Sequence, residues 1–271
     1  MTYLRGMHRR FAQSIRDDGV VTTISKGMRF PFTLLSELQK RLWLARVIRS
    51  KPPAAVFTEI YRRNYWGDGG ESVSGYGSTL ANTAALRQQL VVMFRQFGIE
   101  SVYDAPCGDF NWMGQLVDAT CVAYCGVDIV PELIDANMRR HEGPGRTFKV
   151  SDITRDPFPK ADLWICRDCF FHLSYFDIGH ALRNFVESDI PYVLMTTYIN
   201  DGQFANRDIR TGDFRRIDLF TMPLNFPRDV KYRIDDTAAN DSPREVCLWT
   251  RAQIAAMLPQ FAEAVDDAVR R

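Results

Sequence analysis

Three aspartates recur along the middle of the chain at equal spacing, and each follows a short stretch that favours a β-strand. Asp104, Asp128 and Asp152 lie 24 residues apart, and apolar, β-prone residues precede each of them. After Asp104 the chain turns tightly through the small residues 105–108, and a helix is predicted from Phe110. A strand that ends in an acid and turns sharply into a helix presents a carboxylate and backbone N–H groups to one ligand.

The spacing of the first two acids is typical of a nucleoside-binding site. An acid at the end of the second strand, about 20 residues past a glycine-bearing turn, is placed to bind the two hydroxyls of a ribose. Two cofactor classes use this arrangement: nicotinamide or flavin dinucleotides, and S-adenosylmethionine. A dinucleotide needs Gly-x-Gly-x-x-Gly so that its pyrophosphate can approach the helix, but this turn contains one glycine, Gly108. The sequence therefore favours S-adenosylmethionine.

The turn resembles motif I of the class I S-adenosylmethionine-dependent methyltransferases, whose pattern is acid-x-Gly-Cys/x-Gly-x-Gly. Asp104, Cys107 and Gly108 match this pattern, whereas Pro106 and Phe110 replace its outer glycines. The resemblance implies that the cofactor is S-adenosylmethionine.

A longer string, Asp-Ala-Pro-Cys-Gly-Asp-Phe-Asn-Trp-Met at 104–113, resembles a bacterial methyltransferase subfamily often found among sugar- and glycan-modifying genes. Three further blocks fit that subfamily, at residues 65–75, 166–174 and 211–214. The resemblance covers roughly residues 57–250.

Position in this pattern suggests a role for each cofactor residue. Asp104 and the backbone of 105–108 would face the methionine and ribose end, and Asp128 would bind the ribose hydroxyls. Asp152, with Ile153, would face the adenine amino group. The predicted cofactor-binding residues are Trp66, Ser72, Ser78, Asp104, Ala105, Pro106, Cys107, Gly108, Asp128, Ile129, Asp152, Ile153 and Arg167. The alternative for any single aspartate is a helix cap or a turn.

The segment after the fourth predicted strand carries the candidate catalytic groups. Ligands bind outside the carboxyl ends of parallel strands, and this segment contains Asp168 and His172. His172 is the predicted general base because an imidazole ordinarily titrates near neutrality. Three roles are open for Asp168: it could orient that imidazole, act as the base itself, or help to hold a divalent cation. A purely structural histidine is the alternative.

Residues 199–229 form a long polar loop after the fifth predicted strand, and a loop of this length is more often functional than idle. Its part at 199–215 is predicted to face the acceptor. Its side chains suit a hydroxyl-rich ligand, and carboxylates also bind Mg²⁺. The predicted acceptor-binding residues are Asn200, Asp201, Asn206, Asp208 and Asp213. Asp168 and Asp208 are the candidate metal ligands if the reaction uses Mg²⁺. A solvated, charged loop is the alternative.

Strands alternate with helices along residues 78–197, which predicts a parallel sheet with right-handed crossovers. The predicted fold is α/β and Rossmann-like, a mostly parallel sheet of about seven strands with helices on both faces. A helix is expected to follow Ser78 and to end at Gly98, and another to follow the capping signal at Ser174. Strands are expected at 99–103, 121–127, 146–150, 161–166 and 192–197, and the resemblance implies an antiparallel pair at 231–234 and 245–250.

The first 51 residues differ in charge from the rest of the chain. They hold eleven Lys and Arg against three acids, a balance of +8, within an overall charge of +1. Apolar residues interleave with these bases at helical intervals, and Pro52-Pro53 marks a boundary. The chain is therefore predicted to comprise a basic amphipathic helical extension, 1–51, and a methyltransferase domain, 52–271. The extension could pack on the domain or a partner subunit, lie on an anionic membrane, or bind nucleic acid.

Composition indicates the class of protein, its expected location and the state of its cysteines. Apolar residues make up 46% and charged residues 25% of the chain, as in an ordinary globular protein, and no apolar run is long enough to span a membrane. No secretory signal is present, so a cytoplasmic location is expected, at the inner membrane surface if the extension binds lipid. The six cysteines are expected to be free thiols. The oligomeric state stays open.

The motifs of amino-group and cytosine-C5 nucleic-acid methyltransferases, and the paired glutamates of the protein-arginine type, are missing from the sequence. O-methylation of a hydroxyl on a sugar or glycan is the favoured activity, and a nucleic-acid acceptor is not expected. One alternative is a lipid-linked or aromatic small-molecule acceptor, bound by a cluster of Phe170, Phe171, Phe204, Phe214 and Phe226. Another is a non-catalytic cofactor-binding scaffold whose basic arm holds a membrane or RNA.

Overall fold

The computed structural model describes residues 38–67, 70–237 and 241–270. The chain divides into two compact units, Met1–Ser50 and Lys51–Arg271. In the first unit, residues 38–50 form a helix. The rest of the predicted basic extension, 1–37, lies outside the described residues, so its proposed roles stay predictions.

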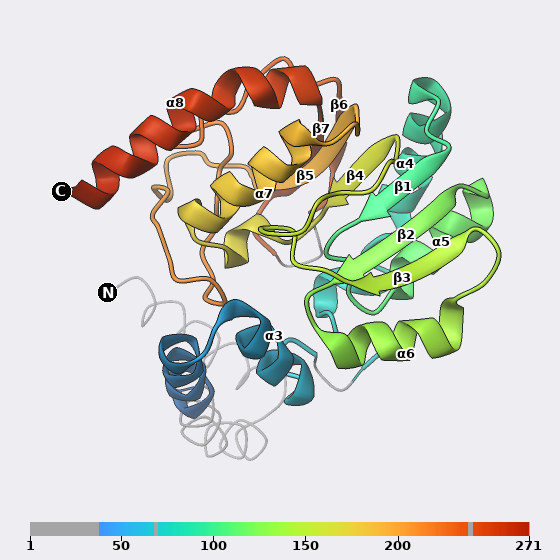
Figure 1. The fold of residues 1–271 in the computed structure, drawn as a ribbon, viewed down its shortest axis with the longest axis horizontal. Coiled ribbons are helices and arrows are strands. Elements are labelled where there is room, and N and C mark those ends of the chain that lie inside the picture. Colours follow the sequence, from blue (N-terminus) through green and yellow to red (C-terminus); the bar gives the residue numbers. More distant parts are fainter. Residues whose placement is uncertain (1–37, 68–69, 238–240, 271) are drawn as a thin grey trace, which may run out of the picture. The chain divides into compact units, whose positions relative to one another are not determined.

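A seven-stranded sheet organises the second unit (Figure 1). The strand order is β3-β2-β1-β4-β5-β7-β6, and β7 runs antiparallel to both of its neighbours while β1 to β5 pair in parallel. The strands are β1 (Ser101–Asp104), β2 (Ala123–Asp128), β3 (Arg146–Val150), β4 (Leu163–Cys166), β5 (Tyr192–Tyr198), β6 (Tyr232–Asp235) and β7 (Arg244–Thr250). This topology confirms the predicted fold class, including the final antiparallel pair.

Helices cover both faces of this sheet, and each face has its own apolar core. Because side chains alternate along a strand, Trp164 and Cys166 of β4 join the core under α7 and α8, which lie side by side in Figure 1. Leu163 and Ile165 join the opposite core, under α4, α5 and α6. The helices are α3 (Pro53–Arg62), α4 (Ala84–Phe97), α5 (Asn111–Thr120), α6 (Pro131–His141), α7 (Tyr175–Glu187) and α8 (Arg251–Arg270).

The predicted end of α4 and the predicted start of α7 are confirmed, whereas the predicted start of α4 is wrong. Gly98 ends α4 in the left-handed conformation with φ of 63°, and Ser174 caps α7 by accepting the N–H of Asp177. The helix expected after Ser78 begins at Ala84 instead, behind a 3₁₀ turn at Tyr76–Ser78. The carbonyl of Ser78 accepts a hydrogen bond from Asn111, which holds this segment against the turn after β1.

Helices α3 and α8 had no counterpart in the sequence-based prediction. Pro53, which was expected to mark a break, occupies the first turn of α3, where a proline loses no helical hydrogen bond. All six cysteines are free thiols, as predicted. Among the described residues, no helix combines the length and apolar character that a membrane span requires.

Candidate functional site

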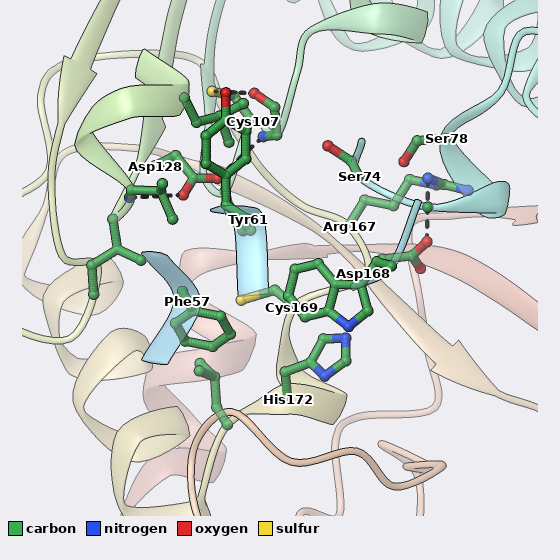
Figure 2. A pocket seen from close by; sticks show the side chains of 18 of the residues that line it. Phe57, Tyr61, Ser74, Ser78, Cys107, Asp128, Arg167, Asp168, Cys169 and His172 are labelled. Carbon is green, nitrogen blue, oxygen red and sulfur yellow. Dashed lines mark hydrogen bonds and ion pairs between the residues drawn. The ribbon is translucent and has the colours of Figure 1, made fainter. Parts of the chain in front are cut away.

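A cavity of about 560 Å³ lies at the carboxyl ends of β1, β2 and β4. Helix α3, Tyr65, Trp66 and residues from 73–78 complete its walls. Figure 2 shows side chains that reach the cavity from different elements. Phe57, Tyr61 and Asp128 lie on one side of the view, and Ser74, Ser78 and Arg167 lie on the other. Cofactor and small-molecule sites have volumes of roughly 300–1,000 Å³, so this cavity has the size of a ligand site.

Asp104, the last residue of β1, places a buried carboxylate at this cavity. It is 3% exposed, and its Oδ2 accepts a 2.6 Å hydrogen bond from the Tyr124 hydroxyl. Burial raises the pKa of Asp104 to about 7, and the Tyr124 bond offsets only part of that effect. No described cation forms an ion pair with Asp104. The group is therefore a buried acid without a paired positive charge.

Asp128, at the end of β2, is the second such acid. Its Oδ2 accepts the N–H of Gly108 at 3.3 Å and its Oδ1 accepts the N–H of Val130 at 3.1 Å. Burial raises its pKa to about 6 despite these backbone bonds. Asp104 and Asp128, predicted from their equal spacing along the chain, thus line one cavity.

Gly108 allows residues 72–74 to lie directly against the turn after β1. Its φ of +54° is left-handed, and a Cβ added there would lie 2.4 Å from the Ser74 hydroxyl. The Ser74 hydroxyl accepts the N–H of Asp109, and the Asp109 carboxylate accepts the Ser72 hydroxyl and the N–H of Val73, both at 2.8 Å. We call residues 72–74, held by Asp109, the clasp.

Of the two serines in the clasp, only one lines the cavity. Ser72, a predicted cofactor-binding residue, bonds Asp109 and does not line the cavity, whereas Ser74 does. Ser74 and Asp109 were missed because their contact joins residues 35 positions apart. Phe57 and Tyr61 of α3 also line the cavity, and no sequence signal distinguished them from ordinary core positions.

Most of the other predicted cofactor-binding residues reach the same cavity. Ala105 is fully buried behind the turn and does not line it. Asp152 lies two residues beyond the end of β3, and its Oδ1 accepts hydrogen bonds from the backbone and hydroxyl of Thr154. The further lining residues from the prediction are Trp66, Ser78, Pro106, Cys107, Gly108, Ile129, Asp152, Ile153 and Arg167.

Arg167 belongs to a buried ion network on the β4 side of the cavity. It binds Asp236 through two nitrogens, at 2.9 and 3.1 Å, and its Nη1 lies 3.3 Å from Asp168. Arg244 lies 3.4 Å from Asp168 and 3.6 Å from Asp236. Burial alone would raise the pKa of Asp168, but the two arginines outweigh burial and lower it. Asp236 and Arg244 were not predicted, because they come from the distant β6–β7 region.

His172 lies in a 3₁₀ turn, Phe170–His172, after β4. Its Nδ1 is 2.9 Å from the Asp213 carbonyl oxygen, which can only accept, so Nδ1 carries the proton and Nε2 is left as the acceptor. No described residue bonds Nε2. The Trp66 and His172 rings lie 4.8 Å apart at 31°. Burial lowers the pKa of His172 to about 4, so the expected value near neutrality is replaced by a ring that is neutral at pH 7.

The five predicted acceptor-binding side chains do not line this cavity. They bond within their own loop or its neighbours: Asn200 to Phe204, Asp201 to Gln203, Asn206 to Asp218, Asp208 to the N–H of Tyr175, and Asp213 to the N–H of Phe214. Tyr198 and Phe214 line the cavity from this region instead. An acceptor-binding role for the five stays a prediction.

The structure gives no support to the expected Mg²⁺ site. In the described part of the chain, no group of three or more His, Cys, Asp or Glu side chains is placed to hold a metal ion. Asp168 contacts two arginines, and Asp208 accepts two backbone N–H groups. Neither carboxylate is arranged with a second one as a cation site.

Comparison with solved structures identifies the architecture. A SAM-dependent methyltransferase from Leishmania major superposes with a TM-score of 0.53 at 14% identity, covering 70% of this chain and 82% of that one. The fold is that of the class I methyltransferases. Magnesium protoporphyrin IX methyltransferase from Synechocystis PCC 6803 gives a TM-score of 0.51 at 14% identity, covering 74% of this chain and 100% of that one.

Human N-acetylserotonin methyltransferase gives a TM-score of 0.49 at 16% identity, and this chain covers 64% of it. No family model matches the sequence, and no curated protein matches it. The two superpositions with TM-scores above 0.5 establish the methyltransferase fold, and the function must be argued from the site.

The residues at the cavity fit S-adenosylmethionine on two counts. Its amino group and sulfonium are cationic, and Asp104 and Asp128 are buried acids without ion-pair partners among the described residues. The turn after β1 has one glycine and is covered by the clasp, which suits a nucleoside without a pyrophosphate. The two acids and the turn thus fit the cofactor that the sequence pattern predicted.

Proposed function

We propose that this protein is an S-adenosylmethionine-dependent methyltransferase whose acceptor occupies the same cavity as the cofactor. The pair of buried, unpaired acids at adjacent strand ends carries the proposal. Asp128 would accept hydrogen bonds from the ribose hydroxyls, and Asp104 would face the cationic amino group. When bound, the cofactor supplies an electrophilic methyl group on a sulfonium.

We further propose that the acceptor is a hydroxyl of a sugar or glycan, with His172 as the proton acceptor. The unbonded Nε2 supports this role, because Nδ1 carries the proton and Nε2 is left as an acceptor at the cavity. Trp66 and Phe214 flank His172, with ring centroids at 4.8 and 5.7 Å, and offer flat apolar surfaces. Asp168 is less suited to act as base because two arginines stabilise its charge.

An aromatic or lipid-linked acceptor is the second candidate, and the cavity lining favours it. Phe171 and Phe214 line the cavity, together with Phe57 and Tyr61 of α3. Of the other predicted aromatic residues, Phe170 and Phe226 are buried in the core. An apolar wall of this kind also suits a planar ring. The two acceptor classes are separated by comparing sugar and phenolic acceptors in a methyl-transfer assay.

Calorimetric binding of S-adenosylmethionine and S-adenosylhomocysteine to the full chain tests the proposal. Asp128→Ala should weaken binding by about 1–3 kcal/mol, the cost of hydrogen bonds left unmade in a buried site. Asp128→Asn, whose single amide oxygen can still accept the N–H of Val130, is a milder variant that controls for folding, and the exposed Asp135→Ala on α6 is the matched surface control. Well-folded wild-type protein that binds neither compound would refute the methyltransferase proposal.

A further inference from the structure

A second cavity of about 470 Å³ adjoins the cofactor cavity. Tyr198, Phe214 and Asp241 line both, so the two cavities are neighbours that share these three residues. Three arginines line the second cavity alone: Arg207, Arg215 and Arg216. We call this the arginine pocket.

Arg215 is the informative residue of the arginine pocket because its guanidinium is buried and incompletely bonded. The residue is 3% exposed, and its Nη1 donates to the Phe170 carbonyl at 2.8 Å. Its Nε and Nη2 are buried and have no hydrogen-bond partner. The guanidinium carbon lies 5.3 Å from the centre of the Tyr175 ring. Buried donors are almost always bonded, so these two nitrogens require an acceptor that no described residue supplies.

Nearby acids do not neutralise the arginine pocket. Asp208 and Asp213 act on Arg215 from beyond ion-pair distance, and burial outweighs them and lowers its pKa to about 10. The Asp208 and Asp213 carboxylates accept backbone N–H groups, and Asp241 lies 3.7 Å from Arg244. In the described part of the chain, no carboxylate forms an ion pair with Arg207, Arg215 or Arg216.

Arg216 is held in place by an aromatic ring rather than by an acid. Its guanidinium carbon lies 4.7 Å from the centre of the Phe204 ring, which leaves its N–H groups available to a ligand. Arg207 is exposed at the rim. Three cations of this kind suit the several oxygens of a phosphoryl group better than a single carboxylate, because guanidinium forks bind phosphate oxygens in pairs.

We propose that the arginine pocket binds a phosphoryl group of the methyl acceptor, so that the acceptor is a phosphorylated molecule whose reacting end lies beside His172. This proposal rests on the methyltransferase function proposed above. Segment 213–216 joins the two sites, because the Asp213 carbonyl holds His172 and the N–H of Arg215 donates to the Phe171 carbonyl. A phosphoryl group on Arg215 would therefore brace the same segment that orients the imidazole.

Binding of simple probes to the full chain tests the arginine pocket without knowledge of the acceptor. Inorganic phosphate, pyrophosphate and acetate are titrated by calorimetry at matched ionic strength, with S-adenosylmethionine binding measured separately. Phosphate should bind more tightly than acetate, and Arg215→Gln and Arg216→Gln should each weaken it about tenfold, a change of about 1.4 kcal/mol. Arg207→Gln, at an exposed residue, keeps the test valid if Arg215→Gln fails to fold.

Arg228→Gln is the matched control, since Arg228 also lies over a phenylalanine ring, Phe220 at 5.5 Å, but outside the arginine pocket. It should leave phosphate binding unchanged. Glucose 1-phosphate and vesicles containing phosphatidic acid then distinguish a soluble phosphate ester from a lipid phosphate.

Wild-type protein that binds S-adenosylmethionine but not phosphate would overturn this proposal and leave the methyltransferase function standing. Phosphate binding without cofactor binding would refute the methyltransferase function and leave the arginine pocket standing as a phosphate site. Tighter binding of acetate than of phosphate, or equal weakening by Arg228→Gln, would also overturn it.

Discussion

Two pairs of acids lie at the same end of the sheet and differ in what surrounds them; Asp104, Asp128 and Asp236 are buried and Asp168 is half-buried. Asp104 and Asp128 follow β1 and β2 without an ion-pair partner among the described residues, and burial raises the pKa of both. Asp168 and Asp236 lie beside β4 and β6 and form ion pairs with Arg167 and Arg244. The arginines lower the pKa of Asp168 against the effect of burial, whereas burial still raises the pKa of Asp236 and the arginines offset part of that rise.

The difference separates a binding site from its scaffold. A buried charge is costly unless it is paired, so an unpaired acid persists where function requires it. The paired acids and arginines instead tie β6 and β7 to the loop after β4, with the Gly77 carbonyl as a further acceptor of Arg167. Asp104 and Asp128 thus form the unpaired half of the site, and Asp168 and Asp236 form the paired half. The positive charge that the unpaired half lacks is the one that we assign to the cofactor.

Asp236→Asn gives the largest expected effect, because it leaves Asp168 as the one carboxylate that Arg167 and Arg244 share, with Asp241 at 3.7 Å from Arg244 alone. The Asp236 side chain is 1% exposed, and breaking a buried pair costs about 3–5 kcal/mol in the free energy of unfolding. Urea unfolding at pH 7 measures this loss. Asp235→Asn is the control, since the neighbouring carboxylate contacts Thr237 at the surface. A loss below about 1 kcal/mol would remove the distinction between the two halves.

Asp104→Asn should increase the free energy of unfolding at high pH, whereas Asp236→Asn decreases it. Since burial raises the pKa of Asp104 from 3.8 to about 7, the folded protein keeps a proton there that the unfolded chain has lost, and this stability disappears as the pH rises from about 4 to about 7. At pH 8 the neutral variant should therefore be more stable without cofactor, by on the order of 4 kcal/mol. Below pH 4 the two proteins should unfold alike.

The same substitution should weaken S-adenosylmethionine binding, so that stability and function move in opposite directions. Urea unfolding at pH 8 and pH 4, together with calorimetry at pH 8, gives both readouts. Equal destabilisation of Asp104→Asn at the two pH values would show that the carboxylate contributes structure rather than an unpaired charge.

The difference between the halves also explains what the sequence could predict. Asp104 and Asp128 were found because each acid directly follows an apolar strand and the first precedes a tight turn, a signal contained in a few adjacent residues. Strand β3 was predicted at its exact bounds for the same reason. The order of the strands followed from alternation with helices, which is also a local pattern.

Contacts between distant segments carried no such signal. Arg167 and Asp236 are 69 residues apart, and the clasp joins Ser72 to Asp109 across 37. The polar loop at 199–215 was predicted to bind the acceptor because of its composition, yet Asn206 and Asp208 bond to backbone groups, as polar loop residues commonly do. Composition predicts where polar groups occur along the chain, but tertiary packing decides which of them face the cavity.

The smallest expected effect comes from removing one hydroxyl in each half. Tyr124→Phe takes away the 2.6 Å bond to Asp104, and Thr196→Val takes away the bonds of its hydroxyl to the carboxylate and N–H of Asp168. Each should cost about 1–2 kcal/mol in the free energy of unfolding at pH 8. The cost of Tyr124→Phe should shrink at pH 5, because Asp104 is then protonated in the folded protein and no longer needs a donor for its charge.

The cost of Thr196→Val should stay the same over this range, because the arginines keep Asp168 ionised at both pH values. Urea unfolding of both variants at pH 5 and pH 8 therefore compares the two halves within one experiment. If the cost of Tyr124→Phe were independent of pH, Asp104 would already be compensated, and the cation that we assign to the cofactor would have no site to fill. A pH-dependent cost at Tyr124 alone would place the missing charge beside β1.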